Sequence, residues 1–179
     1  MTLRQAQDDR EPVETVWQGK YITVSKQGTW EYVGRARGIQ AAVLLAIEAG
    51  DVLLVEQYRV PLGRNCIELP AGLVGDETEG EGIAASAARE LEEETGYRPA
   101  EITPIGEFYS SPGMVSESFT LVRASGLTRV SDGGGVPGED ILVHRVPLAE
   151  LPGFIAAKRA EGLAIDVKLL LLLGGSILG

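Results

Sequence analysis

The chain has 179 residues, with 26 acidic and 16 basic side chains and a formal net charge of -10. This length fits one domain and can bury a core without disulfides or a structural metal. The acidity argues against nucleic-acid binding, because few cations are available to neutralise phosphates. Cys66 is the only cysteine, which excludes an internal disulfide. The polar first 14 residues and the shortness of Leu169–Leu173 predict a cytoplasmic protein with no membrane partner.

The first part of the chain predicts strands. Val13–Val24 and Thr29–Arg37 flank the turn signal Lys26-Gln27-Gly28 and predict a hairpin or meander. The apolar runs Ile39–Ile47 and Val52–Glu56, separated by Gly50-Asp51, predict a pair of strands with a buried face. Residues 59–65 predict a loop, and Ile67–Leu69 predicts a short strand that ends at Pro70.

A Gly-rich acidic loop is expected over Gly72–Gly82, followed by a helix over Ile83–Thr95. Its apolar stripe contains Ala84, Ala87, Ala88 and Leu91, and Gly96 stands where a left-handed cap belongs.

The later elements are strands over 105–109, 118–124 and 141–146, loops around Ser111-Pro112-Gly113 and over 132–138, and helices over 148–161 and 167–173. This order predicts a mixed α/β or α+β fold rather than a regular βαβ alternation.

The segment Arg89-Glu90-Leu91-Glu92-Glu93-Glu94-Thr95-Gly96 carries the strongest chemical signal. On a helix, Glu90, Glu93 and Glu94 fall within about 100° of one another, and like charges four residues apart repel. They also lie near the C-terminal end, where the helix dipole disfavours anions. A hard divalent cation such as Mg²⁺ would remove this repulsion and would favour carboxylates together with substrate phosphates. A solvated acidic face is the alternative for an arbitrary glutamate triplet.

The surrounding spacing resembles the box of the Nudix hydrolase family: Gly, five residues, Glu, seven residues, then Arg-Glu-apolar-any-Glu-Glu-any-Gly-apolar. The fixed positions are filled by Gly75, Glu81, Arg89, Glu90, Leu91, Glu93, Glu94, Gly96 and Tyr97. The resemblance implies an α/β/α sandwich with a mixed sheet, in which a loop, a helix and a second loop bind Mg²⁺ or Mn²⁺. Because a site rather than a fold sets function, the box alone leaves the substrate open.

The resemblance also implies roles for individual residues. Glu90 and Glu94 would be metal ligands, and Glu93 would be a ligand or would contact the attacking water. Arg89 would orient the glutamates, and Glu81 would support the loop. The implied chemistry is attack of water on a diphosphate, with the metal polarising phosphoryl oxygens.

Relatives within this family often carry Ala-Gly at the start of the box. Pro70-Ala71-Gly72 matches that feature, although Gly72 lies three residues before Gly75. We therefore expect a three-residue insertion in the acidic loop, with Gly72 as the structural equivalent of the first box glycine. Ala71 would then offer its backbone carbonyl to the metal.

Features outside the box resemble the branch that acts on ADP-ribose and other nucleoside diphosphate sugars. Ile67–Gly72 matches the strand that enters the box. Ser111-Pro112-Gly113 follows the box at the distance where ADP-ribose hydrolases carry proline. The resemblance thus marks Pro112 and Gly113 as substrate-binding. Glu56-Gln57-Tyr58-Arg59 matches a segment whose arginine contacts the diphosphate, so Arg59 is expected to bind the substrate through bidentate contacts.

The general base is left open by the sequence. Gly138-Glu139-Asp140-Ile141 resembles a late loop whose glutamate reaches the metal, which suits Glu139, but Pro137 stands where relatives carry a second acid. Glu117 is another acid near the family's sites. Glu117 or Glu139 would activate water, with Glu93 as a further participant.

The N-terminal strands are expected to form a separate region, 1–38, which crosses to a second subunit and covers the substrate, while 39–179 forms the hydrolase domain. Trp30 could stack on a purine, with Arg35 and Arg37 as further substrate contacts. His144 is expected to be structural, and Asp166 and Lys168 to have capping and surface roles.

The first hypothesis from the sequence is a homodimeric, Mg²⁺-dependent hydrolase that converts ADP-ribose to AMP and ribose 5-phosphate. Asp132-Gly133-Gly134-Gly135-Val136 also resembles GDP-mannose hydrolases, which keeps GDP-mannose or another nucleotide sugar open as the substrate. A Nudix-type binding or regulatory module without turnover is the alternative from another functional class.

Overall fold

The computed structural model describes residues 11–36, 40–74 and 82–178, and a mixed β-sheet forms the centre of the molecule. The sheet order is β13-β6-β5-β4-β10-β9, with β12 paired to β5 and β7 paired to β4. β4 and β10 run parallel, whereas β4 is antiparallel to β5 and β7. Its strands are β4 (Gln40–Glu48), β5 (Asp51–Arg59), β6 (Arg64–Glu68), β7 (Ala71–Val74), β9 (Glu101–Tyr109), β10 (Ser118–Ser125), β12 (Leu142–Pro147) and β13 (Ala164–Ile165).

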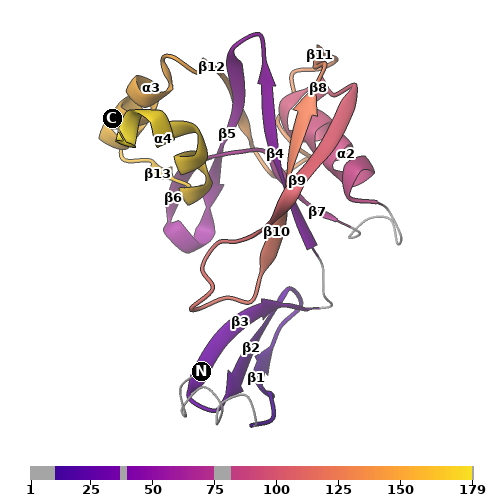
Figure 1. The fold of residues 1–179 in the computed structure, drawn as a ribbon, viewed down its shortest axis with the longest axis vertical. Coiled ribbons are helices and arrows are strands. Elements are labelled where there is room, and N and C mark those ends of the chain that lie inside the picture. Colours follow the sequence, from indigo (N-terminus) through magenta and orange to yellow (C-terminus); the bar gives the residue numbers. More distant parts are fainter. Residues whose placement is uncertain (1–10, 37–39, 75–81, 179) are drawn as a thin grey trace.

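Helices cover both faces of this sheet, as Figure 1 shows. α2 (Ile83–Thr95) lies on one face, and α3 (Leu151–Ala160) and α4 (Leu170–Leu178) lie on the other. The apolar run in β4 explains this layering, because successive strand residues point to opposite faces. Leu44 packs into the cluster under α2, whereas Val43 and Leu45 pack into the cluster under α3 and α4. The mixed fold with helices on two faces is therefore confirmed.

A second sheet is formed by β1 (Glu14–Gln18), β2 (Ile22–Gln27) and β3 (Trp30–Arg35). All of its neighbouring pairs are antiparallel, which confirms the predicted meander. Figure 1 shows that it projects from one end of the main body. It is attached where Val33 donates to the Met114 carbonyl at 3.0 Å and the Ser116 amide donates to the Val33 carbonyl at 2.9 Å.

The central helix agrees with its predicted bounds. α2 spans Ile83–Thr95, and Gly96 has φ +76, the left-handed geometry expected of its cap. A side chain at Gly96 would also overlap the Ser131 carbonyl, so both backbone conformation and space require glycine.

Several predicted boundaries were wrong. Residues 72–74 of the expected acidic loop belong to β7, which pairs with β4 from Ala71 to Val74. Residues 75–81, including Gly75 and Glu81, lie outside the described residues. The expected loop over 59–65 is shorter, since it holds the 3₁₀ helix η2 (Val60–Leu62) between longer strands.

The C-terminal part also differs from expectation. α3 begins at Leu151 rather than at 148. Pro152 lies in its first turn, where the backbone N–H groups have no hydrogen-bond partner within the helix, so proline is tolerated there. The helix predicted over 167–173 is a 3₁₀ turn, η3 (Val167–Leu169), followed by α4 to Leu178. β13 and the small pair β8 (Tyr97–Arg98) and β11 (Thr128–Arg129) were not predicted, because two-residue strands leave no periodicity.

Within the described residues, no helix is long and apolar enough to cross a membrane. Cys66 is buried, and burial raises the pKa of its thiol to about 12. At neutral pH it is therefore a protonated, unreactive thiol in the core.

Candidate active site

A cavity of about 530 Å³ opens beside the C-terminal half of α2. Strands, α2 and two loops contribute to its wall. Its carboxylates are Glu68, Glu90, Glu93, Glu94, Glu117 and Glu139, and its cationic side chains are Arg35, Arg59, Arg89 and Lys168. The cavity thus brings together most of the side chains that the sequence marked as catalytic, metal-binding or substrate-binding.

Helix geometry brings the three α2 glutamates to this wall. Glu90, Glu93 and Glu94 are three and four residues apart, so they share one face of α2. Arg89 pairs with two of them: its Nη2 lies 3.0 Å from Glu90 Oε1 and its Nη1 lies 3.1 Å from Glu93 Oε2. Arg89 is therefore paired with the glutamates rather than standing apart on a solvated face, and its orienting role stays a prediction.

Glu94 is the most buried of the three and is only 8% exposed. Its Oε2 accepts a hydrogen bond of 3.0 Å from the Ala71 amide, which connects α2 to β7. Burial, with smaller contributions from the charges of Glu90 and Glu139, raises the pKa of Glu94 to about 8. The Ala71 hydrogen bond and Arg59 act in the opposite direction. A carboxylate at this position is thus costly without a cation.

Gly72 allows the strand to approach α2 closely. A Cβ at this position would overlap the Cγ and Cδ atoms of Glu90. The missing side chain therefore leaves the space that the Glu90 carboxylate fills. This contact agrees with the expectation that Gly72 is the structural equivalent of the first box glycine.

Glu139 enters the cavity from the Gly-rich loop between β11 and β12. Its Oε2 accepts a hydrogen bond of 3.0 Å from the Val136 amide. Its backbone carbonyl accepts one of 3.4 Å from Gln57 Nε2 of β5. These contacts hold Glu139 at the cavity wall, close enough to Glu94 for its charge to raise the Glu94 pKa.

Arg59 lines the cavity and is held by Glu68. Its Nε donates to Glu68 Oε1 at 2.6 Å and its Nη2 donates to Glu68 Oε2 at 3.0 Å, a bidentate pair. This pairing raises the pKa of Arg59, although burial opposes it. The guanidinium is therefore fixed in direction beside the acidic wall.

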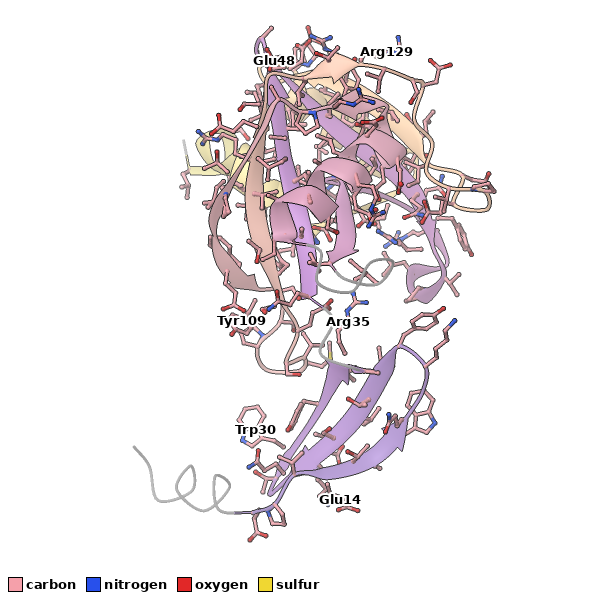
Figure 2. All side chains as sticks on the ribbon, turned by 90° about the vertical axis from the view of Figure 1, so that its right-hand side faces the viewer. Glu14, Trp30, Arg35, Glu48, Tyr109 and Arg129 are labelled. Carbon is pink, nitrogen blue, oxygen red and sulfur yellow. The ribbon has the colours of Figure 1, made fainter. Side chains whose placement is uncertain are left out.

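Arg35 is the residue of the N-terminal sheet that reaches the cavity. Its Nη2 lies 2.6 Å from Glu117 Oε1, and Figure 2 places it at the junction of the two sheets. Trp30, at the other end of β3, is 51% exposed and does not line the cavity. Pro112 and Gly113 do not line it either, and Arg37 lies outside the described residues.

Two charged residues of the cavity were not predicted from the sequence as site residues. Lys168 was expected at the surface, but it lines the cavity, with its Nζ 2.8 Å from Asp166 Oδ2 and 5.7 Å above the Phe119 ring. Asp166 does cap η3, as expected, by accepting from the Lys168 amide. Glu68, the partner of Arg59, stands in the Ile67–Gly72 motif, so the motif contained a signal for it.

His144 lies away from the cavity. Its Nε2 is 2.9 Å from Glu56 Oε2, and Lys158 Nζ is 3.2 Å from the same oxygen. Asn65 donates to the other Glu56 oxygen at 2.9 Å. These contacts connect β5, β6, β12 and α3, and they agree with the structural role expected of His144.

The cavity wall offers several oxygen donors to a divalent cation. Across 11–36, 40–74 and 82–178, no three acidic, histidine or cysteine side chains converge closely enough to hold a metal together. The carboxylates of Glu90, Glu93, Glu94 and Glu139 nevertheless share the cavity wall. Mg²⁺ and Mn²⁺ favour carboxylate oxygen ligands, and a cation would relieve the repulsion between these carboxylates, so the donor chemistry fits.

Comparison with known proteins places the chain among hydrolases of one family. The model of the NUDIX domain matches residues 36–164. The chain is 37% identical over 146 residues to the GDP-mannose pyrophosphatase of Cronobacter sakazakii, covering 76% of this chain and 72% of that protein. It is 45% identical over 87 residues to the ADP-ribose pyrophosphatase of Bacillus subtilis, covering 49% of this chain.

The match spans 45% of the length of the Bacillus subtilis protein, less than half of it. Among solved structures, the crystal structure of an ADP compounds hydrolase has a TM-score of 0.68 and is 23% identical, covering 92% of this chain and 93% of that one. At this identity the likeness shows a shared fold.

Proposed function

The chain belongs to the Nudix hydrolase family, and we propose that it hydrolyses the diphosphate bond of a nucleoside diphosphate sugar, with ADP-ribose as the preferred substrate. One observation carries the proposal: six glutamates and three arginines share the wall of a single cavity. The carboxylates suit a divalent cation, and the guanidiniums suit the negative charge of a diphosphate.

The proposed metal ligands are Glu90, Glu94 and the Ala71 carbonyl, with Glu93 and Glu139 as further oxygen donors. When bound, Mg²⁺ or Mn²⁺ supplies Lewis-acid polarisation of phosphoryl oxygens and lowers the pKa of water. Arg89 keeps Glu90 and Glu93 in place through its two ion pairs. The raised pKa of Glu94 means that its carboxyl holds a proton near neutral pH. Binding of the cation would therefore require Glu94 to lose that proton.

The protein's part in the chemical step is to orient and to accept a proton. Arg59, fixed by Glu68, binds a phosphate of the substrate. Water adds to one phosphorus atom as the bond to the bridging oxygen breaks, giving AMP and ribose 5-phosphate from ADP-ribose. The water's proton passes to a carboxylate, for which Glu139 is our first choice. Glu93 is engaged in an ion pair with Arg89, and Glu117 in one with Arg35, whereas the Glu139 carboxylate accepts, among the described residues, only from a backbone amide.

We assign residues 1–38 to a region that covers the substrate and mediates dimerisation, and 39–179 to the hydrolase domain. Arg35 supports the first assignment, since it reaches the cavity from β3. The exposed Trp17 and Trp30 give the N-terminal sheet apolar surface suited to a second copy. In that arrangement Trp30 would stack on the base of a substrate held by the partner, with Arg37, Pro112 and Gly113 as further contacts.

GDP-mannose is the second candidate, because the Cronobacter sakazakii relative named for it matches over a larger share of this chain than the ADP-ribose relative does. A panel of nucleotide sugars with Mg²⁺, resolved by chromatography, separates the two. AMP formed from ADP-ribose faster than GMP from GDP-mannose supports the first assignment, and the reverse ranking supports the second. Absence of turnover on every diphosphate with Mg²⁺ or Mn²⁺ would overturn both.

A further inference from the structure

The loop that carries Glu139 is anchored on the C-terminal end of α2. The Gly134 amide donates to the Glu94 carbonyl at 2.9 Å, and the Gly135 amide donates to the Glu93 carbonyl at 3.0 Å. The Ile141 amide then donates to the Gly134 carbonyl at 3.1 Å. The last carbonyls of a helix lack partners within it, so these contacts satisfy groups that would otherwise face water or the core.

The anchoring explains why the loop is glycine-rich. Gly133, Gly134 and Gly135 all have positive φ, at +69, +110 and +78. A Cβ at Gly133 would overlap the backbone of Thr95, which shows how closely the loop approaches the helix. Only glycine adopts three such conformations in a row at low cost.

At Gly135, unlike at Gly133, the absent side chain leaves room for another side chain, that of Glu139. A Cβ there would overlap Glu139 Oε2 and lie 3.0 Å from Glu139 Cβ and from Ile141 Cδ1. The carboxylate that hydrogen-bonds the Val136 amide therefore fills the space above Gly135. A methyl group at this position would displace the flexible end of Glu139 rather than a segment of backbone.

We propose that Gly135 is a positioning residue that sets the place of the Glu139 carboxylate relative to Glu93 and Glu94. The backbone carbonyls of those two glutamates hold the loop, and their side chains line the cavity into which the loop delivers Glu139. The three carboxylates are thus connected through the main chain. This inference rests on the proposed function, because it assigns Glu139 to the same reaction.

The experiment compares Gly135→Ala with Gly50→Ala. Gly50 has φ +88 with open space around it and lies in the β4–β5 turn, so its substitution carries the backbone strain without displacing a carboxylate. We expect both variants to lose stability in urea to a similar extent. Gly135→Ala should also weaken Mn²⁺ binding, measured by electron paramagnetic resonance, and lower kcat about tenfold with KM within twofold, whereas Gly50→Ala should keep both values within twofold of wild type.

A double variant separates positioning from a general structural effect. If Gly135 acts through Glu139, Gly135→Ala should add less than a twofold loss to Glu139→Gln, whereas independent effects would multiply. A multiplied loss, or an unchanged Gly135→Ala enzyme, would overturn the inference while leaving the proposed function intact.

If the wild-type protein turns over no nucleotide sugar, the proposed function fails on its own. Amide hydrogen exchange then tests the position of the Glu139 carboxylate without any measurement of activity. Val136 should exchange slowly in wild type and faster in Gly135→Ala, which displaces the carboxylate that accepts from its amide, and in Glu139→Ala, which removes that carboxylate. Equal rates in all three proteins would overturn the inference.

Discussion

The Glu94 carboxylate accepts a hydrogen bond from the Ala71 amide at 3.0 Å, which ties the C-terminal turn of α2 to the strand β7. A nearly buried acid in contact with one amide donor, and close to two other acids, has its pKa raised to about 8. Near neutral pH the Glu94 carboxyl is therefore mostly protonated, and a bound cation would favour its ionised form.

Cation binding near neutral pH should release about one proton for each Glu94 carboxylate that ionises. Isothermal titration of Mg²⁺ or Mn²⁺ at pH 7 in buffers with different ionisation enthalpies measures this number. The released proton should be absent in Glu94→Gln, which serves as the control. Equal proton release in wild type and variant would show that another group titrates on binding.

The metal-free protein should also lose stability as pH rises. The pKa of Glu94 is raised from an ordinary value of 4.5 to about 8, so the folded state holds the proton more tightly than the unfolded state. The stabilisation from this group is complete below pH 4.5 and is lost as pH rises through 8. Urea unfolding with a chelator should therefore show Glu94→Gln gaining stability relative to wild type between pH 5 and pH 8.5. A pH-independent difference would contradict the assigned pKa.

Gly72→Ala should lower kcat while the protein stays folded. The added Cβ overlaps the Glu90 side chain, so that carboxylate must move. A misplacement of about 1 Å in a catalytic constellation can reduce the rate by about 100-fold. Gly63→Ala, at a positive-φ turn with open space around it, is the control for general strain. Comparable kcat values for the two variants would argue against Gly72 as a shaping residue.

Arg59→Lys should raise KM for ADP-ribose roughly tenfold or more, because lysine cannot reproduce a bidentate guanidinium contact. The same change removes the fork that pairs with both Glu68 oxygens. Arg64→Lys, at an arginine outside the cavity, provides the matched control and should leave KM unchanged. An unchanged KM in Arg59→Lys would remove this residue from the substrate site.

The sequence predicted the parts of the site that depend on local periodicity. The bounds of α2 and the cap at Gly96 follow from helix spacing and from one conformational requirement. The shared face of Glu90, Glu93 and Glu94 follows from the same geometry. The fold class could be predicted too, because the apolar run in β4 has to be covered on both faces.

Contacts between distant segments could not be predicted. The pairing of Arg35 with Glu117 joins residues 82 positions apart, and no periodicity encodes it. Lys168 lines the cavity because η3 and α4 pack against the sheet. This packing is a tertiary contact, and the local sequence around Lys168 predicted an exposed position instead. The strand β7 could not be predicted from its glycine-rich segment, because it forms only through its pairing with β4.

The central claim is that the α2 glutamates support metal-dependent hydrolysis of a nucleotide sugar. The most direct measurement is the rate of AMP formation from ADP-ribose with Mg²⁺ by wild type and by Glu94→Gln, with folding of both checked by circular dichroism. The account predicts turnover by wild type that a chelator abolishes, and a loss of at least about 100-fold in the folded variant. Equal turnover by the two proteins, or wild-type turnover that persists with the chelator, would contradict it.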